Sequence, residues 1–90
     1  MSDLDIFRQI ILSFQVQGMI ALGKLEHPYK KAKEINLEVA ETAFDMLKTI
    51  QEKTKGNLSE EEQNFLNDAI NQLQDDLENE KNMELNNKEK

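Results

Sequence analysis

Apolar side chains in the first quarter of the chain recur at the spacing of an α-helix. At about 100° per residue they fall on one face of a segment from about residue 4 to residue 23, which predicts a helix with a buried side. That face comprises Leu4, Phe7, Ile10, Ile11, Phe14, Gly18, Ala21, Leu22 and Leu25. The other side carries a second apolar strip, comprising Leu12, Val16, Met19 and Ile20. A helix that is apolar on two sides is expected to contact two neighbours.

Gly18 lies at the centre of the main apolar face. Inside a helix, glycine is about 1 kcal/mol less favourable than alanine, so its presence asks for a reason. Close approach of another helix is the interpretation that we prefer. We therefore join Gly18 to Leu12, Val16, Met19 and Ile20 as a candidate self-association interface.

Two further segments, about 37–55 and about 60–80, also show helical periodicity. Asn36 is placed to cap the first of these helices. The residues expected on its buried side are Leu37, Val39, Ala40, Ala43, Phe44, Met46, Leu47 and Ile50. In the second, a seam with spacings of four, three and four comprises Leu66, Ile70, Leu73 and Leu77, with Phe65 and Ala69 beside it. The chain therefore reads as an all-α domain of three helices over residues 1–80.

The stretch TKGNLSEEE at residues 54–62 predicts a tight corner between the second and third helices. Gly56 suits the left-handed conformation that ends a helix. Ser59 and Glu62 have the spacing of a capping box, in which each side chain bonds the backbone amide of the other. So short a connection favours an antiparallel helical hairpin.

The connector over residues 24–35 is long for a helical bundle, and Pro28 disfavours helix at His27. Such a connector lets the first helix pack at a distance from the hairpin, or on the hairpin of a neighbouring chain. Beyond Leu77 the apolar repeat stops, so residues 81–90 are expected to form a disordered acidic and polar tail.

Composition restricts the chemistry that the chain can perform. There is no cysteine and only one histidine, which removes thiolate sites and paired-histidine metal sites within one chain. No carboxylate pair sits in an apolar setting and no glycine-rich phosphate loop follows a strand, so we expect no enzyme, metal or cofactor. The formal charge of −7 lies in residues 60–90, since residues 1–59 are neutral; this argues against binding nucleic acid or anionic lipid.

One local cluster opposes this average charge. The connector holds a candidate anion patch comprising His27, Tyr29, Lys30, Lys31 and Lys33. The alternative function is therefore a regulatory binder of an anionic ligand or RNA, although three lysines with one aromatic fall short of a nucleic-acid footprint. The N-terminus is acidic where a signal peptide is basic, and the apolar run from Ile10 to Leu22 is too short to span a bilayer, so a cytoplasmic location is expected.

The segments LSFQVQGMIALGKL and INLEVAETAFDMLKTIQEKTKGNLSEEEQNFLNDAINQL resemble the small bacterial family called domain of unknown function 1844. The resemblance covers about residues 6–77 and implies a short all-α cytoplasmic protein, with no established activity, cofactor or catalytic residue. The connector EHPYKKAKE and the QDDLENE of the last helix depart from the family pattern.

The apolar strip on the first helix leads to the functional expectation. We expect a non-catalytic interaction module that forms a homo-oligomer, with a dimer favoured, through the first helix. A different, unidentified protein covering the same strip is the rival account.

Overall fold

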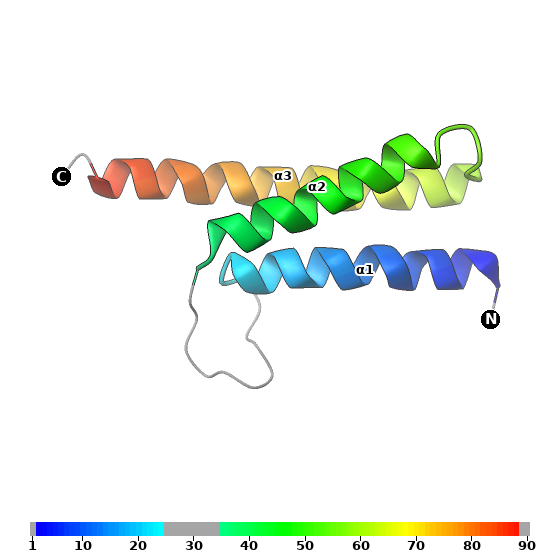
Figure 1. The fold of residues 1–90 in the computed structure, drawn as a ribbon, viewed down its shortest axis with the longest axis horizontal. Helices are drawn as coiled ribbons and strands as arrows, with labels where there is room; N and C mark the ends of the chain where they lie inside the picture. Colours follow the sequence, from blue (N-terminus) through cyan, green and yellow to red (C-terminus); the bar gives the residue numbers. More distant parts are fainter. Residues whose placement is uncertain (1, 25–34, 89–90) are drawn as a thin grey trace.

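The computed structural model describes residues 2–24 and 35–88, which fold into three helices (Figure 1). They are α1 (Asp3–Ala21), α2 (Leu37–Lys53) and α3 (Glu60–Lys88). α1 and α3 run in the same direction, and α2 runs antiparallel to both. Each helix packs against the other two, and no strand occurs in the described part of the chain. The expected all-α, three-helix fold is confirmed.

The core lies where the apolar stripes of the three helices meet. In α3 the expected seam is buried along its whole length, since none of its four residues exposes more than 5% of its surface. α2 contributes small residues beside one leucine, which lets it lie close to both neighbours. The buried apolar residues are Ile11, Ala21, Leu22, Ala40, Ala43, Leu47, Leu66, Ala69, Ile70, Leu73 and Leu77.

Three residues expected in the core are exposed instead. Ile10, Val39 and Met46 each expose more than a third of their surface. Each of them directly precedes a residue that is fully buried, and one step along a helix turns the side chain by about 100°. The buried stripe of each helix is therefore narrower than its apolar face, and the prediction for these three positions was wrong.

Gly18 is buried at the contact between all three helices. A Cβ atom there would lie 2.8 Å from Leu73 Cδ1 and 3.4 Å from Ala43 Cβ. The first distance is shorter than van der Waals contact, so glycine allows α3 and α2 to approach α1. A close approach at Gly18 thus exists, and it occurs within the chain.

The corner between α2 and α3 has the geometry that the sequence predicts. Gly56 has a φ of +85°, in the left-handed region. The Ser59 amide donates to Glu62 Oε1 at 2.8 Å, and the Glu62 amide donates to Ser59 Oγ at 3.2 Å. Both hydrogen bonds of the capping box are present. They pair two backbone amides that would otherwise lack a partner, and this stabilises the start of α3.

α1 begins and ends with local hydrogen bonds. Ser2 and Asp5 form a capping box at its start, which the sequence analysis did not identify. Gly23 has a φ of +75°, and the Lys24 amide donates to the Met19 carbonyl at 2.8 Å while the Gly23 amide donates to the Ile20 carbonyl at 3.0 Å. This pair of bonds is a Schellman motif, which ends the helix firmly.

The start of α2 is tied to the end of α1. The Asn36 amide donates to the Ala21 carbonyl at 2.7 Å, and Asn36 Oδ1 accepts from the Val39 amide as the predicted N-cap. The two ends of the connector are thereby brought together. α1 packs directly on the hairpin of its own chain, although the length of the connector would also allow packing at a distance.

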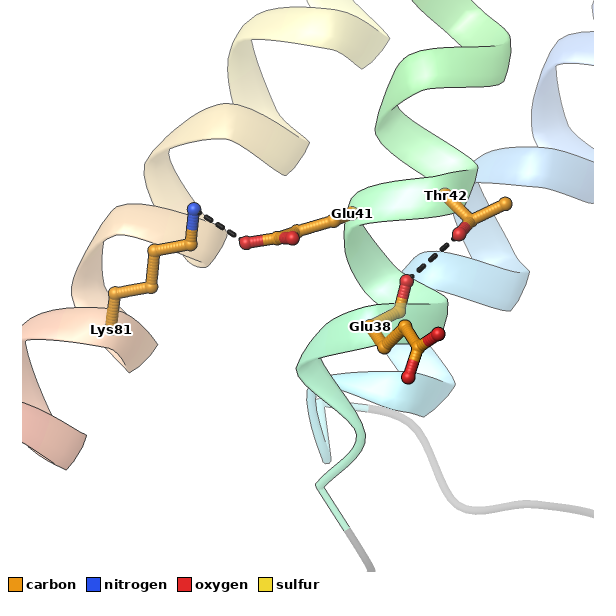
Figure 2. Close-up of polar contacts among 4 residues, drawn as sticks. All are labelled: Glu38, Glu41, Thr42 and Lys81. Atoms are coloured by element: carbon orange, nitrogen blue, oxygen red, sulfur yellow. Dashed lines mark hydrogen bonds and ion pairs between the residues drawn. The ribbon is translucent and has the colours of Figure 1, made fainter.

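α3 continues well past the predicted end near residue 80, as far as Lys88. Lys81 Nζ lies 2.6 Å from Glu41 Oε1 on α2, an ion pair that Figure 2 shows bridging the two helices. Extending a formed helix fixes few dihedral angles for each added hydrogen bond, so residues without an apolar repeat still continue it. The expectation of a disordered tail is not met over residues 81–88.

Candidate interaction surface

The side of α1 that faces away from the core is apolar. Four of its residues, Ile6, Ile10, Leu12 and Val16, each expose between 38% and 47% of their surface, and Met19 and Ile20 are half-buried. We call this set of six residues the outer apolar face. Single exposed apolar residues are ordinary on a protein surface, whereas several on one helix indicate a surface for an interaction.

Contacts with α3 show how α1 is rotated in the bundle. The guanidinium of Arg8 lies over the Phe65 ring, 5.6 Å from its centroid. Gln15 Nε2 donates to Gln72 Oε1 at 2.8 Å. The flank of α1 that carries Arg8 and Gln15 therefore faces α3.

Ile6 and Ile10 lie about 160° around α1 from Arg8, so they lie on the flank away from α3. Leu12 and Met19 lie near the Arg8 flank, at its outer edge. The outer apolar face thus spans the whole width of the helix between its two neighbours. The sequence analysis found only the half of it formed by Leu12, Val16, Met19 and Ile20.

α2 adds two exposed apolar residues on its own flank away from α3. Glu41 reaches toward Lys81 on α3, while Thr42 points to the other side of α2, where its hydroxyl donates to the Glu38 carbonyl at 2.9 Å (Figure 2). Val39 and Met46 lie about 140–160° around α2 from Glu41. They therefore border the junction of α1 and α2 on the side remote from α3.

Charge is absent from the outer apolar face. From Gln9 to Gly23 the chain has no ionisable side chain, whereas α3 carries nine acidic and two basic residues and so a net charge of −7. Uncharged apolar surface is what protein interfaces place at their centre, and charged residues are depleted there. The one described surface with this character is that of α1.

The remaining candidate residues from the sequence do not join this face. Gly18 is buried under Leu73 and Ala43, on the opposite side of α1 from the exposed residues. The candidate anion patch lies outside the described residues, and its members are His27, Tyr29, Lys30, Lys31 and Lys33. The candidate interface therefore keeps four of its five predicted residues and gains Ile6 and Ile10.

A cleft of about 660 Å³ lies beside the corner of the hairpin, between α2 and α3. Its lining includes two lysines, Lys48 and Lys55, and two carboxylates, Asp45 and Glu52. Gln51 Nε2 donates to Asn67 Oδ1 at 2.7 Å within it. The two lysines balance the two carboxylates, and the two side-chain amides bond each other. The cleft therefore has no cluster of like charges that would bind an ion or a charged ligand.

The described residues contain no group of three or more carboxylate or histidine side chains arranged to hold a metal ion. Within the same part of the chain, no helix combines the length and apolarity needed to cross a bilayer. Neither observation adds a second candidate site to the outer apolar face.

Comparison with known proteins gives a family and no activity. No curated protein and no solved structure matches the chain. A family model matches residues 4–79, which include all of α2, nearly all of α1 and the bundled part of α3. The chain belongs to the family described as domain of unknown function (DUF1844).

Proposed function

We propose that this protein is a non-catalytic assembly module that forms a homodimer through the outer apolar face of α1. The observation that carries the proposal is the exposure of Ile6, Ile10, Leu12 and Val16 on a helix without charge from Gln9 to Gly23. Within a monomer such a face would contact water, which is unfavourable for each side chain.

The free energy gained by covering the outer apolar face is large enough to offset much of the cost of association. Complete burial of an aliphatic side chain contributes about 1.5–3 kcal/mol relative to full exposure. Half of that gain, for four residues on each of two copies, amounts to roughly 6–12 kcal/mol. The loss of translational and rotational freedom on association is about 4–15 kcal/mol, which is of the same size, so a weak and reversible dimer is the expected outcome.

Charge supports α1 over α3 as the helix that meets the second copy. Each α3 has a net charge of −7, so two α3 helices would repel one another. Two copies of α1 meet without such repulsion. The contact would be isologous, meaning that the same residues of both copies form it.

The test is a comparison of two double variants that place the same charges on different helices. Val16→Glu with Met19→Lys alters the outer apolar face, and Val39→Glu with Met46→Lys alters α2. The two valines are matched, since Val16 exposes 38% and Val39 37% of their surfaces, and both variants keep the net charge of the parent. Light scattering and sedimentation equilibrium are expected to show a dimer for the parent and the α2 variant, and a monomer for the α1 variant.

Two results would contradict the proposal. A parent that is monomeric at high micromolar concentration rules out self-association and points to a different protein on this face. Dissociation by the α2 variant together with an intact dimer for the α1 variant would move the interface to α2. Because Met19 is half-buried, Leu12→Lys with Val16→Glu serves as a second α1 variant, and circular dichroism checks that each variant stays helical.

A further inference from the structure

The outermost line of α1 has an isoleucine at equal distance on each side of a central serine. Opposite the buried Ile11 and Gly18, the helix presents Ile6, Gln9, Ser13, Val16 and Ile20, spaced by three, four, three and four residues. This is the spacing of a two-helix seam, and its two outer isoleucines each lie seven residues from Ser13. A pairing that runs antiparallel about Ser13 therefore places Ile6 of one copy at the level of Ile20 of the other.

Ser13 is suited to the centre of such a pairing. Its side chain is small, which permits two helices to come close. Its hydroxyl donates to the Ile10 carbonyl at 2.8 Å, so the donor is satisfied inside its own helix. Covering Ser13 with a second copy would then leave no orphan hydroxyl donor at the interface.

Charged residues flank the uncharged stretch of α1, and those that do not face α3 differ in sign at its two ends; Arg8 lies over Phe65 of α3. Asp3 and Asp5 lie in the first turn, and Lys24 follows the last turn and is exposed. In an antiparallel pair about Ser13, Lys24 of one copy reaches the level of Asp3 of the other. A parallel pair would instead place like charges together at both ends, which is unfavourable.

α3 gives an independent reason for the same orientation. It runs in the same direction as α1, and its C-terminal part extends beyond the other two helices (Figure 1). Most of the acidic residues of α3 lie before that extension, and three of them, Glu60, Glu61 and Glu62, lie in the first turn of the helix. A parallel pair of α1 helices would place the two acidic first turns of α3 at the same end of the dimer. An antiparallel pair places these two acidic turns at opposite ends and so separates them.

We infer, on the basis of the proposed self-association, that two copies pair through antiparallel α1 helices, with the twofold axis near Ser13. The attraction between Lys24 of one copy and the acidic first turn of the other, which holds both Asp3 and Asp5, favours this orientation. Asp5 therefore retains part of the attraction when Asp3 carries a spin label. The dimer then presents the acidic first turn of one α3 helix at each of its two ends.

Distances between spin labels test the orientation. The chain has no cysteine, so Asp3→Cys and Gln17→Cys each introduce a single labelling site on an exposed residue. At 1.5 Å per residue, the antiparallel pair separates the two labels at position 3 by about 30 Å along the axis and those at position 17 by about 12 Å. A parallel pair brings both sets of labels to within roughly the 8–10 Å spacing of packed helices, plus the label tethers.

Each outcome of this measurement decides something different. A long distance at position 3 with a short one at position 17 supports the antiparallel dimer. Short distances at both positions overturn the antiparallel orientation and leave the proposed self-association standing. The absence of dipolar coupling at both positions, together with a monomer mass for the unlabelled parent, overturns self-association and the orientation with it.

Charge reversal provides a second test. Asp3→Lys and Lys24→Glu are each expected to raise the dimer Kd about two- to tenfold at low salt, and the double variant is expected to restore the Kd of the parent to within about twofold. Lys48→Glu is the control, because Lys48 is exposed and lines the cleft between α2 and α3. Failure of the double variant to recover affinity would contradict the pairing of Asp3 with Lys24.

Discussion

α1 and α3 occupy similar positions in the bundle but differ on the side away from it. Both bury one apolar stripe against the other helices, and they run in the same direction (Figure 1). The outward side of α3 is acidic, as expected for a helix in contact with water. The outward side of α1 carries exposed isoleucine, leucine and valine, with no charge from Gln9 to Gly23.

This difference shows which helix leaves an apolar face uncovered by its own chain. In α3 the apolar seam from Leu66 to Leu77 is buried, and Met83 in the extension is the exposed apolar residue of its described side chains. α1 has one face covered by its own chain and one face uncovered. The proposed interaction therefore involves α1, while α3 contributes to the core and has an acidic outer surface.

The largest expected effect is in the core that the two helices share. Leu73→Ala should lower the free energy of unfolding by about 2–5 kcal/mol, because Leu73 is fully buried. In the Leu73→Ala background, Gly18→Ala should stabilise the fold by about 1 kcal/mol through helix propensity. In the parent it should stabilise the fold less, or destabilise it, because Leu73 Cδ1 lies only 2.8 Å from the new methyl position. Chemical denaturation measures both, and an equal effect of Gly18→Ala in the two backgrounds would contradict this packing.

The next effect concerns the uncovered side of α1. If two copies cover it, the melting temperature of the parent should rise by about 5–10 °C for a hundredfold increase in protein concentration above the Kd. The variant Val16→Glu with Met19→Lys should melt at a temperature independent of concentration. Thermal circular dichroism at several concentrations measures this, and a parent without concentration dependence would count against a dimer.

The N-terminal caps of the two helices allow a finer comparison. Ser59→Ala at α3 should lower the free energy of unfolding by about 1 kcal/mol, since both of its cap bonds lie inside the folded corner. Ser2→Ala at α1 should lower it by only a few tenths of a kcal/mol, because the capping box is exposed and the return bond from the Ser2 amide is 3.4 Å long. Urea denaturation of the two variants should show this order, and the reverse order would mean that the start of α1 is held as firmly as that of α3.

The smallest effect concerns the extension of α3. Lys81→Ala should lower the free energy of unfolding by no more than about 0.5 kcal/mol, because both Lys81 and Glu41 are about half exposed and their ion pair is screened by water. The effect should disappear in high salt. A loss of more than 1 kcal/mol would show that the extension is more than a solvated continuation of the helix.

Local signals in the sequence were enough to predict the three helices and the corner between α2 and α3. Gly56 alone fits a positive φ without strain, and the three-residue spacing of Ser59 and Glu62 lets each side chain reach the amide of the other. The seam from Leu66 to Leu77 is likewise a property of the chain, since helical periodicity places those residues on one side before any packing occurs. These features depend on neighbours within a few residues.

Tertiary structure decided which apolar residues are covered. Ile10, Val39 and Met46 belong to the apolar faces of their helices by sequence, yet they are exposed because the rotation of each helix depends on two neighbours at once. The contact of Gly18 with Leu73 joins residues far apart in the chain, so no local pattern reveals that the close approach is made by α3. The width of the outer apolar face follows from the same rotation, and for that reason the sequence alone pointed to α1 but missed Ile6 and Ile10.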